Sequence, residues 1–431
     1  MNYVQLDDCR EWQFENITEF KGGEMQPYFA DCGTGLGDDE NSSDNTFMHT
    51  FINAKESDVV SYAAELEKSC KKVFENNIEG NLFYQFSAAE GLLYFSYLKS
   101  GGTARIILDR CQQENAGDFG YSDYENLCGD TRFAQYSLHY DEMIRGTTCD
   151  CGMNYVYRLR DNSLIIIDGG EFEQATDSAI SDYMDFLHSL TGTSAGEKMR
   201  VSLYICTHAH NDHCDFMSKT IRFHSDEIEV ERIAFNFPNP QNTRHSLSVA
   251  VFKKRLSEKY PQAEYIRPHA GCRFSIANAD IEILCSNEDT IGADSEDIYP
   301  GTNDTSMIFC VEADGLKTLF LADCSEDNGA VIIGNYSEKV TDSTFLQAAH
   351  HGINEIYDVY ERLHAKELLL PQCRMNMDMR FSENYSHMCA LYGEENILFA
   401  HDATDIFTVK NGEYTSEKRA HVGEAYDGSE W

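Results

Sequence analysis

Residues 207–213 have the sequence Thr207-His208-Ala209-His210-Asn211-Asp212-His213, and they follow an apolar run at 201–206 that is typical of a buried strand. Side chains of a strand alternate with a period of two, so a backbone that stays extended would place His208 and His210 on one side. Two imidazoles so placed can share one metal ion. The chain must then turn, which returns Asp212 and His213 to the same region, where they can bind a second ion. Because neutral imidazole and carboxylate are the usual ligands of zinc and iron, we predict a metal site here.

Three further segments combine an apolar run with a polar end: Ser163–Gly170 ends in Asp-Gly-Gly, Lys317–Asp323 in Ala-Asp, and Phe345–Gly352 in His-His-Gly. Together with residues 207–213, and in this order, they resemble the metallo-β-lactamase superfamily. The resemblance covers roughly residues 136–410. With Asn303-Asp304-Thr305-Ser306, these ends are most similar to one branch of the superfamily. That branch includes the soluble hydrolase domain of bacterial DNA-uptake competence proteins and phosphorylcholine esterases of cell-wall teichoic acid.

The resemblance implies an α/β fold, a four-layer αββα sandwich with metals at the strand ends along one edge. It also implies two divalent metal ions, zinc in the first place, with manganese or iron as alternatives. The ligand positions that it implies are His208 and His210 for the first ion, helped by Asp304; Asp212, His213 and His350 for the second; and Asp323 as the bridge.

Within the His-His pair we favour His350 as the ligand because it directly continues the strand at 345–349. His351 would then be a neighbouring donor or the acid that protonates the leaving group, and Asp212 would orient the attacking hydroxide. Asp168 is expected to accept a hydrogen bond from a ligand imidazole and so to fix its tautomer.

The first metal position departs from the superfamily pattern. Many members have another metal-binding histidine upstream of the bridging aspartate, but this chain has Asn303 and Asp304 there. Either of them supplies a weaker oxygen ligand, or the first metal has an open position.

The chain divides near residue 135. Residues 1–135 predict a small α+β domain, with a helix over Ser57–Phe74 and strands at Asn81–Ser87, Gly91–Lys99 and Ala104–Asp109. The polar stretch Asp31–Asp44 predicts an exposed loop. This domain contains no His or Cys cluster, so its role can be docking, substrate gating or oligomer contact. Residues 136–431 alternate strands and helices, which predicts layered α/β packing, and the polar tail after Gly412 should fray.

Charge and composition limit the possible partners. The net charge is −39, from 73 acidic and 34 basic residues, which disfavours nucleic acid and leaves a small anionic substrate possible because metal ions supply local positive charge. No apolar run reaches the length of a membrane span, and the N-terminus lacks the features of a signal peptide. Cysteines such as Cys206, Cys285 and Cys310 lie in apolar strands, which indicates buried thiols of a cytoplasmic chain. The pair Cys149 and Cys151 is interpreted as strand alternation.

These observations favour a metal-dependent hydrolase that uses a metal-bridging hydroxide on a small phosphodiester or phosphoester. The substrate class comes from the resemblance alone. The alternatives are a lactonase or thioesterase on the same site, a two-iron oxidoreductase, and a non-catalytic metal-binding scaffold. The oligomeric state is left open.

Overall fold

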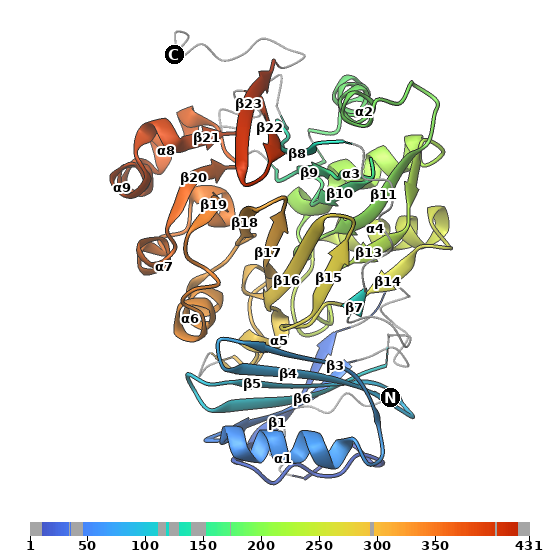
Figure 1. Ribbon diagram of the computed structural model, residues 1–431, viewed down its shortest axis with the longest axis vertical. Helices are drawn as coiled ribbons and strands as arrows, with labels where there is room; N and C mark the ends of the chain where they lie inside the picture. The colour runs from blue at the N-terminus through green and yellow to red at the C-terminus, as the bar shows by residue number, and fades with distance from the viewer. Residues whose placement is uncertain are drawn as a thin grey trace.

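Three β-sheets form the framework of the computed structural model (Figure 1). It describes residues 11–33, 35, 46–110, 118–119, 129–138, 152–172, 174–293, 297–400 and 403–420, with only the backbone at 118–119. In these residues, no helix is long and apolar enough to cross a membrane.

The N-terminal unit is a six-stranded antiparallel sheet with one helix, α1 (Glu56–Leu66), packed on its outer face. Its strands, in spatial order, are β1 (Glu24–Gly33), β2 (Thr46–Ile52), β6 (Thr103–Asp109), β5 (Gly91–Leu98), β4 (Asn81–Ala88) and β3 (Lys71–Ile78). The buried α1 side chains Val59, Tyr62, Ala63 and Leu66 recur at helical spacing and join an aromatic core with Phe20, Phe51 and Phe95. Figure 1 shows this unit in blue, with α1 on the side of the sheet that faces away from the rest of the chain.

Two predictions for this unit differ from the structure. The helix ends at Leu66 rather than Phe74, because the residues from Lys71 onward form β3, which pairs with β4 through a bulge between Lys72 and Phe74. The predicted exposed loop at 31–44 begins inside β1, where Asp31 is buried; residues 34 and 36–45 lie outside the described residues.

The C-terminal unit contains a nine-stranded and an eight-stranded sheet. The first has the order β14 (Glu264–Ile266), β13 (Arg232–Ala234), β11 (Met199–Ile205), β10 (Leu164–Ile167), β9 (Tyr155–Arg158), β8 (Thr131–Gln135), β22 (Thr404–Lys410) and β23 (Glu413–Arg419), with β12 (Ile228–Val230) on β11. The second has the order β21 (Ile397–Phe399), β20 (Ala365–Leu370), β19 (Ser343–Gln347), β18 (Leu316–Phe320), β17 (Ile308–Ala313), β16 (Ala279–Cys285), β15 (Arg273–Ile276) and β7 (Asp118–Phe119).

These pairings correct two further predictions. Strands β7 and β8 lie within residues 1–135 but belong to the sheets of the C-terminal unit, so the change of sheet lies between Asp109 and Asp118. The chain after Gly412 does not fray at once, because β23 pairs along its whole length with β22.

The two large sheets pack face to face with helices outside, in the predicted αββα order. One apolar core joins their inner faces, for example Ile165 and Leu203 of one sheet with Phe309 and Phe345 of the other. A second core lies under α2 (Asp177–Thr191), α3 (Asn211–His224) and α4 (Leu247–Lys259), and a third under α6 (Glu326–Asn335), α7 (Tyr357–Arg362), α8 (Arg374–Arg380) and α9 (Ser382–Tyr392). Figure 1 shows these helix groups on opposite sides of the sheets.

Buried charges and polar groups fasten the N-terminal unit to the C-terminal unit. Arg105 of β6 contacts the Asp289 carboxylate at 3.1 Å, within the short helix α5 (Asn287–Thr290). His269 lies between Asp109 at 3.1 Å and Glu288 at 2.9 Å. All of these side chains are buried. Burying a charge costs free energy unless the charge is paired. The pairs across this contact therefore favour the docked arrangement of the two units.

Candidate metal centre

The predicted site residues converge at the carboxyl ends of parallel strands. Strand β10 pairs in parallel with β11, and β18 pairs in parallel with β19. Asp168 follows β10, residues 207–210 follow β11, Asp323 follows β18, and residues 349–352 follow β19 as a short 3-10 turn, η3. Parallel strands end at the same edge of a sheet, so four segments far apart in sequence reach one place.

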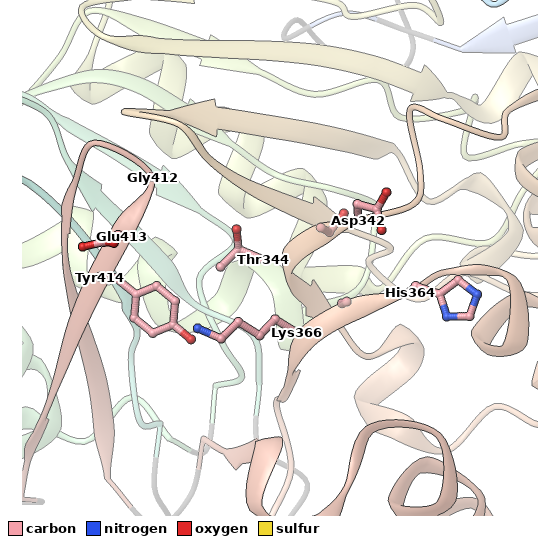
Figure 2. Close-up of a pocket in the computed structure, with 9 residues that line it drawn as sticks. Asp342, Thr344, His364, Lys366, Gly412, Glu413 and Tyr414 are labelled. Atoms are coloured by element: carbon pink, nitrogen blue, oxygen red, sulfur yellow. The ribbon is translucent and has the colours of Figure 1, made fainter.

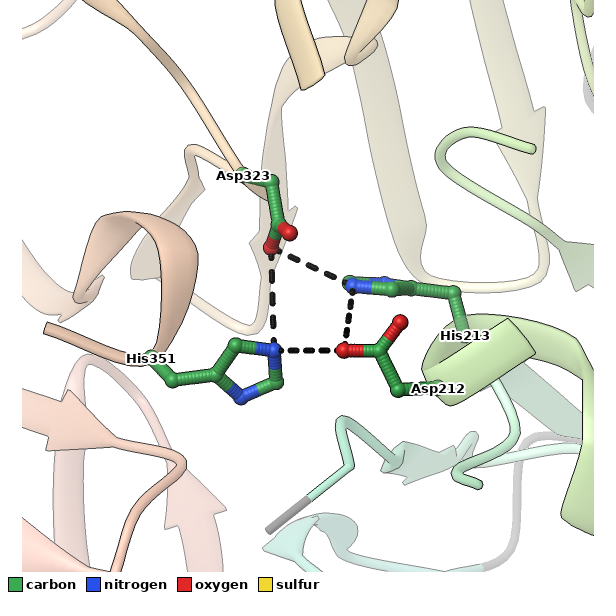
Figure 3. Close-up of side chains that lie close together, drawn as sticks. All are labelled: Asp212, His213, Asp323 and His351. Carbon is green, nitrogen blue, oxygen red and sulfur yellow. Dashed lines mark hydrogen bonds and ion pairs between the residues drawn. The ribbon is translucent and has the colours of Figure 1, made fainter. Parts of the chain in front are cut away.

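The chain turns after His210, as predicted, because helix α3 begins at Asn211. His210 keeps an extended backbone and caps the helix, and Asp212 and His213 lie in its first turn. Figure 3 shows Asp212 and His213 facing Asp323 and His351. One ligand-type atom from each of these four residues lies within 4.8 Å of the others, and His208, His210 and Asp323 form a second such group.

Asp323 belongs to both groups because its two oxygens face different imidazoles. Oδ1 lies 3.2 Å from Nε2 of His213 and 3.9 Å from Nε2 of His351. Oδ2 lies 3.5 Å from Nε2 of His208 and 3.6 Å from Nε2 of His350. Both oxygens and His213 Nε2 are buried, and none makes a hydrogen bond among the described residues. Buried polar atoms rarely lack partners, so these convergent atoms fit a cation between them.

Hydrogen bonds on the far side of the rings fix which imidazole nitrogen faces the cluster. His213 Nδ1 donates to Asp168 at 2.8 Å, and His351 Nδ1 donates to the carbonyl of Pro371 at 3.0 Å. In both rings Nε2 is therefore the nitrogen that faces Asp323. The contact predicted for Asp168 is present, and Asp168 also accepts from Thr207 N at 2.8 Å, which ties the ends of β10 and β11 together.

The backbone is strained where the strands meet the cluster. Asp168, Ala322, His350 and His351 have φ between 46° and 58°, in the left-handed region that non-glycine residues rarely adopt. Such strain is typical of functional sites, where the surrounding structure holds it in place.

The structure places His351, and not the predicted His350, in the group with Asp212 and His213. The left-handed backbone at His350 and His351 is the reason. Strand β19 ends at Gln347, so strand alternation does not continue into η3. The two left-handed residues direct His351 to Asp212 and His350 to the other side of Asp323. The group of His208, His210 and Asp323, here called the His208 side, thus has the imidazole of His350 nearby. The sequence still lacks the histidine that many superfamily members have upstream of the bridging aspartate.

Asp304 is not part of the cluster, contrary to prediction. Its carboxylate accepts a hydrogen bond from Gly301 N at 3.0 Å and closes a loop. The neighbouring Asn303 faces the site instead, with its side-chain nitrogen 3.2 Å from His350 Nε2 and its oxygen buried without a hydrogen bond among the described residues. The other nitrogen of His350 contacts Asn354 Oδ1 at 2.6 Å, and no sequence signal marked that residue.

Burial and charge give the His208 side the protonation that metal binding requires. Burial lowers the pKa of His208 and lowers the pKa of His210 to about 4, so both rings are neutral near pH 7. Burial alone would raise the pKa of Asp323, but His213 and His208 hold it well below its usual range. Two neutral imidazoles and an ionised bridging carboxylate are suitable cation ligands. On the other side the neighbouring carboxylates outweigh burial and raise the pKa of His213 and His351, the latter to about 9, so these two imidazoles must release a proton when they bind a metal.

A separate pocket of about 660 Å³ lies at the other end of β19 and β20 and contains none of these residues. It is lined by Asp342, Ser343, Thr344, His364, Ala365, Lys366, Gly412, Glu413 and Tyr414 (Figure 2). The Lys366 ammonium lies 4.4 Å from the centre of the Tyr414 ring. Because β19 and β20 begin here and end at the cluster, this pocket is not part of the candidate metal centre.

Comparison with known proteins gives similarity at the level of structure. No protein-family model and no curated protein sequence matches the chain. Similar solved structures include Zn²⁺-bound PqqB from Methylobacterium extorquens, at 8% identity over 63% of this chain and 99% of that one, with a TM-score of 0.38. They also include Tm1679, a metal-dependent hydrolase of the β-lactamase superfamily, at 8% identity over 67% and 100%, with a TM-score of 0.36.

A third similar structure is CmlA, a diiron β-hydroxylase from Streptomyces venezuelae. It is 12% identical over 57% of this chain, with a TM-score of 0.32, and the match spans 46% of its own length.

The fold class rests on the layers and the strand-end residues themselves. Two sheets packed face to face between helices, with the histidine and aspartate segments at one strand edge, give this chain a metallo-β-lactamase-type fold. A small α+β unit precedes it.

Proposed function

We propose that this protein is a metal-dependent hydrolase with a dinuclear centre, acting on a small phosphodiester or phosphoester. The observation that supports it most is Asp323, whose two buried oxygens each face a different set of imidazoles. When bound, two divalent ions, zinc first and manganese or iron as alternatives, would lower the pKa of a shared water and polarise the substrate oxygen. His208 and His210 would hold the first ion, and Asp212, His213 and His351 the second.

The side chains around the centre would do the remaining work. Asp212 lies 3.0 Å from His351 and is the one carboxylate of the cluster that is partly exposed, at 24% of its side chain. Burial alone would raise the pKa of Asp212, but His213 and His351 hold it well below its usual range, so this carboxylate stays ionised and can orient an attacking water. Asp168 and the Pro371 carbonyl keep the ligand rings of His213 and His351 in place.

Activity on a substrate panel tests the proposed reaction. Protein incubated with Zn²⁺ or Mn²⁺ should hydrolyse a chromogenic phosphodiester or phosphomonoester faster than a chromogenic lactone, thioester or β-lactam. Preference for the lactone or the thioester would favour the lactonase or thioesterase alternative. Metal binding with no turnover on any of them would favour the scaffold.

Metal stoichiometry is expected to be about two ions per chain, and Asp323→Ala should lose both sites. Elemental analysis after dialysis gives the count, and thermal melting gives a readout that needs no activity, because a ligand bound only by the folded state raises the melting temperature. Asp304→Ala is the matched control and should keep both ions, since its carboxylate faces Gly301. Less than about half an equivalent of metal in the reloaded wild-type protein would contradict the prediction.

Long nucleic acids are expected to be poor substrates. Binding of a phosphate backbone grows with the number of Lys and Arg contacts, and the chain has a net charge of −39. Plasmid or single-stranded DNA should therefore remain intact under conditions in which a small aryl phosphodiester is cleaved. DNA degradation that is salt-sensitive and disappears in His208→Ala would reverse this prediction and favour a nuclease.

A further inference from the structure

The segment 236–246, here called the rim loop, connects the N-terminal unit to the candidate metal centre. It runs between β13 and α4. Near its start, Asn239 donates to the Asp31 carboxylate of β1 at 2.8 Å, and Asn242 donates to the Asp31 carbonyl at 3.3 Å. Arg267, which is fully buried, donates to both Phe237 of the loop and Cys32 of β1. One part of the rim loop is thus fixed by the N-terminal unit.

The other end of the rim loop is fixed to the metal cluster. Ser246 N donates to the carbonyl of Ala209 at 3.2 Å, and Ser246 Oγ accepts from Asn211 N at 3.2 Å. Ala209 and Asn211 flank His210 in the sequence. The backbone next to Ser246 therefore lies beside one of the two histidines of the His208 side.

A second segment holds the same part of the loop from the opposite direction. Thr243 Oγ1 donates to the carbonyl of Pro300 at 3.2 Å, and Thr302 Oγ1 donates to the carbonyl of Arg244. Thr302 directly precedes Asn303, which contacts His350. Arg244 is therefore placed between two backbone segments that each lead directly into the cluster.

Arg244 is exposed, and its guanidinium makes no hydrogen bond or ion pair with the residues that the structure describes. Several other arginines of this acidic chain have carboxylate partners, such as Arg200 with Asp161 and Arg374 with Glu394. A guanidinium presents donors in a planar fork that matches a phosphate or carboxylate group. A free guanidinium carried by a backbone segment beside a metal centre is available to the anionic part of a substrate.

We propose that Arg244 is a substrate-binding residue that holds an anionic oxygen of the substrate at the edge of the metal centre. The N-terminal unit, through Asp31, sets the position of the loop that carries it. This inference rests on the proposed function and narrows the range of substrates, because it requires a substrate with an anionic group. It also gives the N-terminal unit a role in substrate recognition.

Kinetics of Arg244→Gln test the proposal. On the best phosphodiester of the panel, KM should rise about tenfold or more, with kcat changed less than about threefold, because binding of the anion is lost in ground state and transition state alike. Arg244→Lys should restore part of the affinity. KM for any neutral ester that the enzyme accepts should not change. Arg362→Gln is the matched control, since Arg362 is also exposed and without a partner among the described residues.

Binding of inorganic phosphate provides a second measurement that needs no turnover. Titration calorimetry of metal-loaded wild-type protein should show binding that Arg244→Gln weakens about tenfold, with metal content and melting temperature unchanged. Unchanged phosphate affinity and unchanged KM in Arg244→Gln would overturn the inference while the hydrolase proposal stands. Absence of turnover in the wild type would remove the hydrolase proposal, and phosphate affinity would still decide the role of Arg244.

Discussion

Asp212→Ala should lower kcat on the best panel substrate by about two to four orders of magnitude, the range expected for loss of one positioned catalytic group. Asp212 lies at the start of α3, and its Oδ2 is 3.0 Å from Nε2 of His351 and 3.9 Å from Nε2 of His213. The substitution removes a proposed metal ligand and the carboxylate that would orient the attacking water. Steady-state kinetics at saturating metal, with metal content measured in parallel, separate the two losses.

Asp226→Ala is the control, because Asp226 follows the same helix and is exposed. It should keep wild-type turnover. Asp212→Ala should also keep the wild-type circular dichroism spectrum, since the cores under α3 do not include this side chain. Turnover of Asp212→Ala within about threefold of wild type would remove Asp212 from the mechanism.

The layers of the C-terminal unit could be predicted because many of its buried strands are short apolar runs that can be recognised in the sequence. Runs such as Leu164–Ile167 and Ile397–Phe399 are apolar throughout, as expected for strands covered on both faces. β23 is different: most of its residues are exposed, so only pairing with β22 identifies it as a strand. The sequence predicts a helix over the start of β3 because Cys70, Val73 and Phe74 continue the helical spacing of apolar residues, and the bulge between Lys72 and Phe74 breaks the alternation of a strand.

The site could be predicted where its geometry is local. His208, His210, Asp212 and His213 lie within six residues, and one strand end followed by a helix start decides their directions. The positions of His350 and His351 depend on two left-handed residues, which the sequence does not reveal. Asn303 and Asp304 are consecutive residues of a 3-10 turn, and the sequence does not reveal which side chain faces the cluster. The hydrogen bond from Gly301 N to the Asp304 carboxylate shows that Asp304 faces away from it. Arg244 has no motif, and its place depends on contacts with three other segments.

Arg105→Met should lower the free energy of unfolding by about 3–5 kcal/mol, the usual effect of breaking a buried ion pair on one side. Its Nη1 contacts Asp289 Oδ1 at 3.1 Å, and Nη2 donates to the Asp289 carbonyl at 2.9 Å. Both side chains are nearly fully buried, at 8% and 3% exposure. The substitution leaves the carboxylate of Asp289 buried at the contact between the two units without its cation. Urea unfolding, followed by fluorescence and circular dichroism, measures the change.

Two controls show whether the loss comes from the unpaired charge. Adding Asp289→Asn to Arg105→Met should recover part of the stability, because the amide can be buried at lower cost than an uncompensated carboxylate. Lys72→Met breaks the exposed pair with Glu67 in the same N-terminal unit and should stay within about 0.5 kcal/mol of wild type. Equal losses for Arg105→Met and Lys72→Met would mean that the buried pair does not hold the units together. A large loss confined to Arg105→Met would show that the buried pair holds the two units together, and docking would then also fix the rim loop, which is anchored on the same N-terminal sheet.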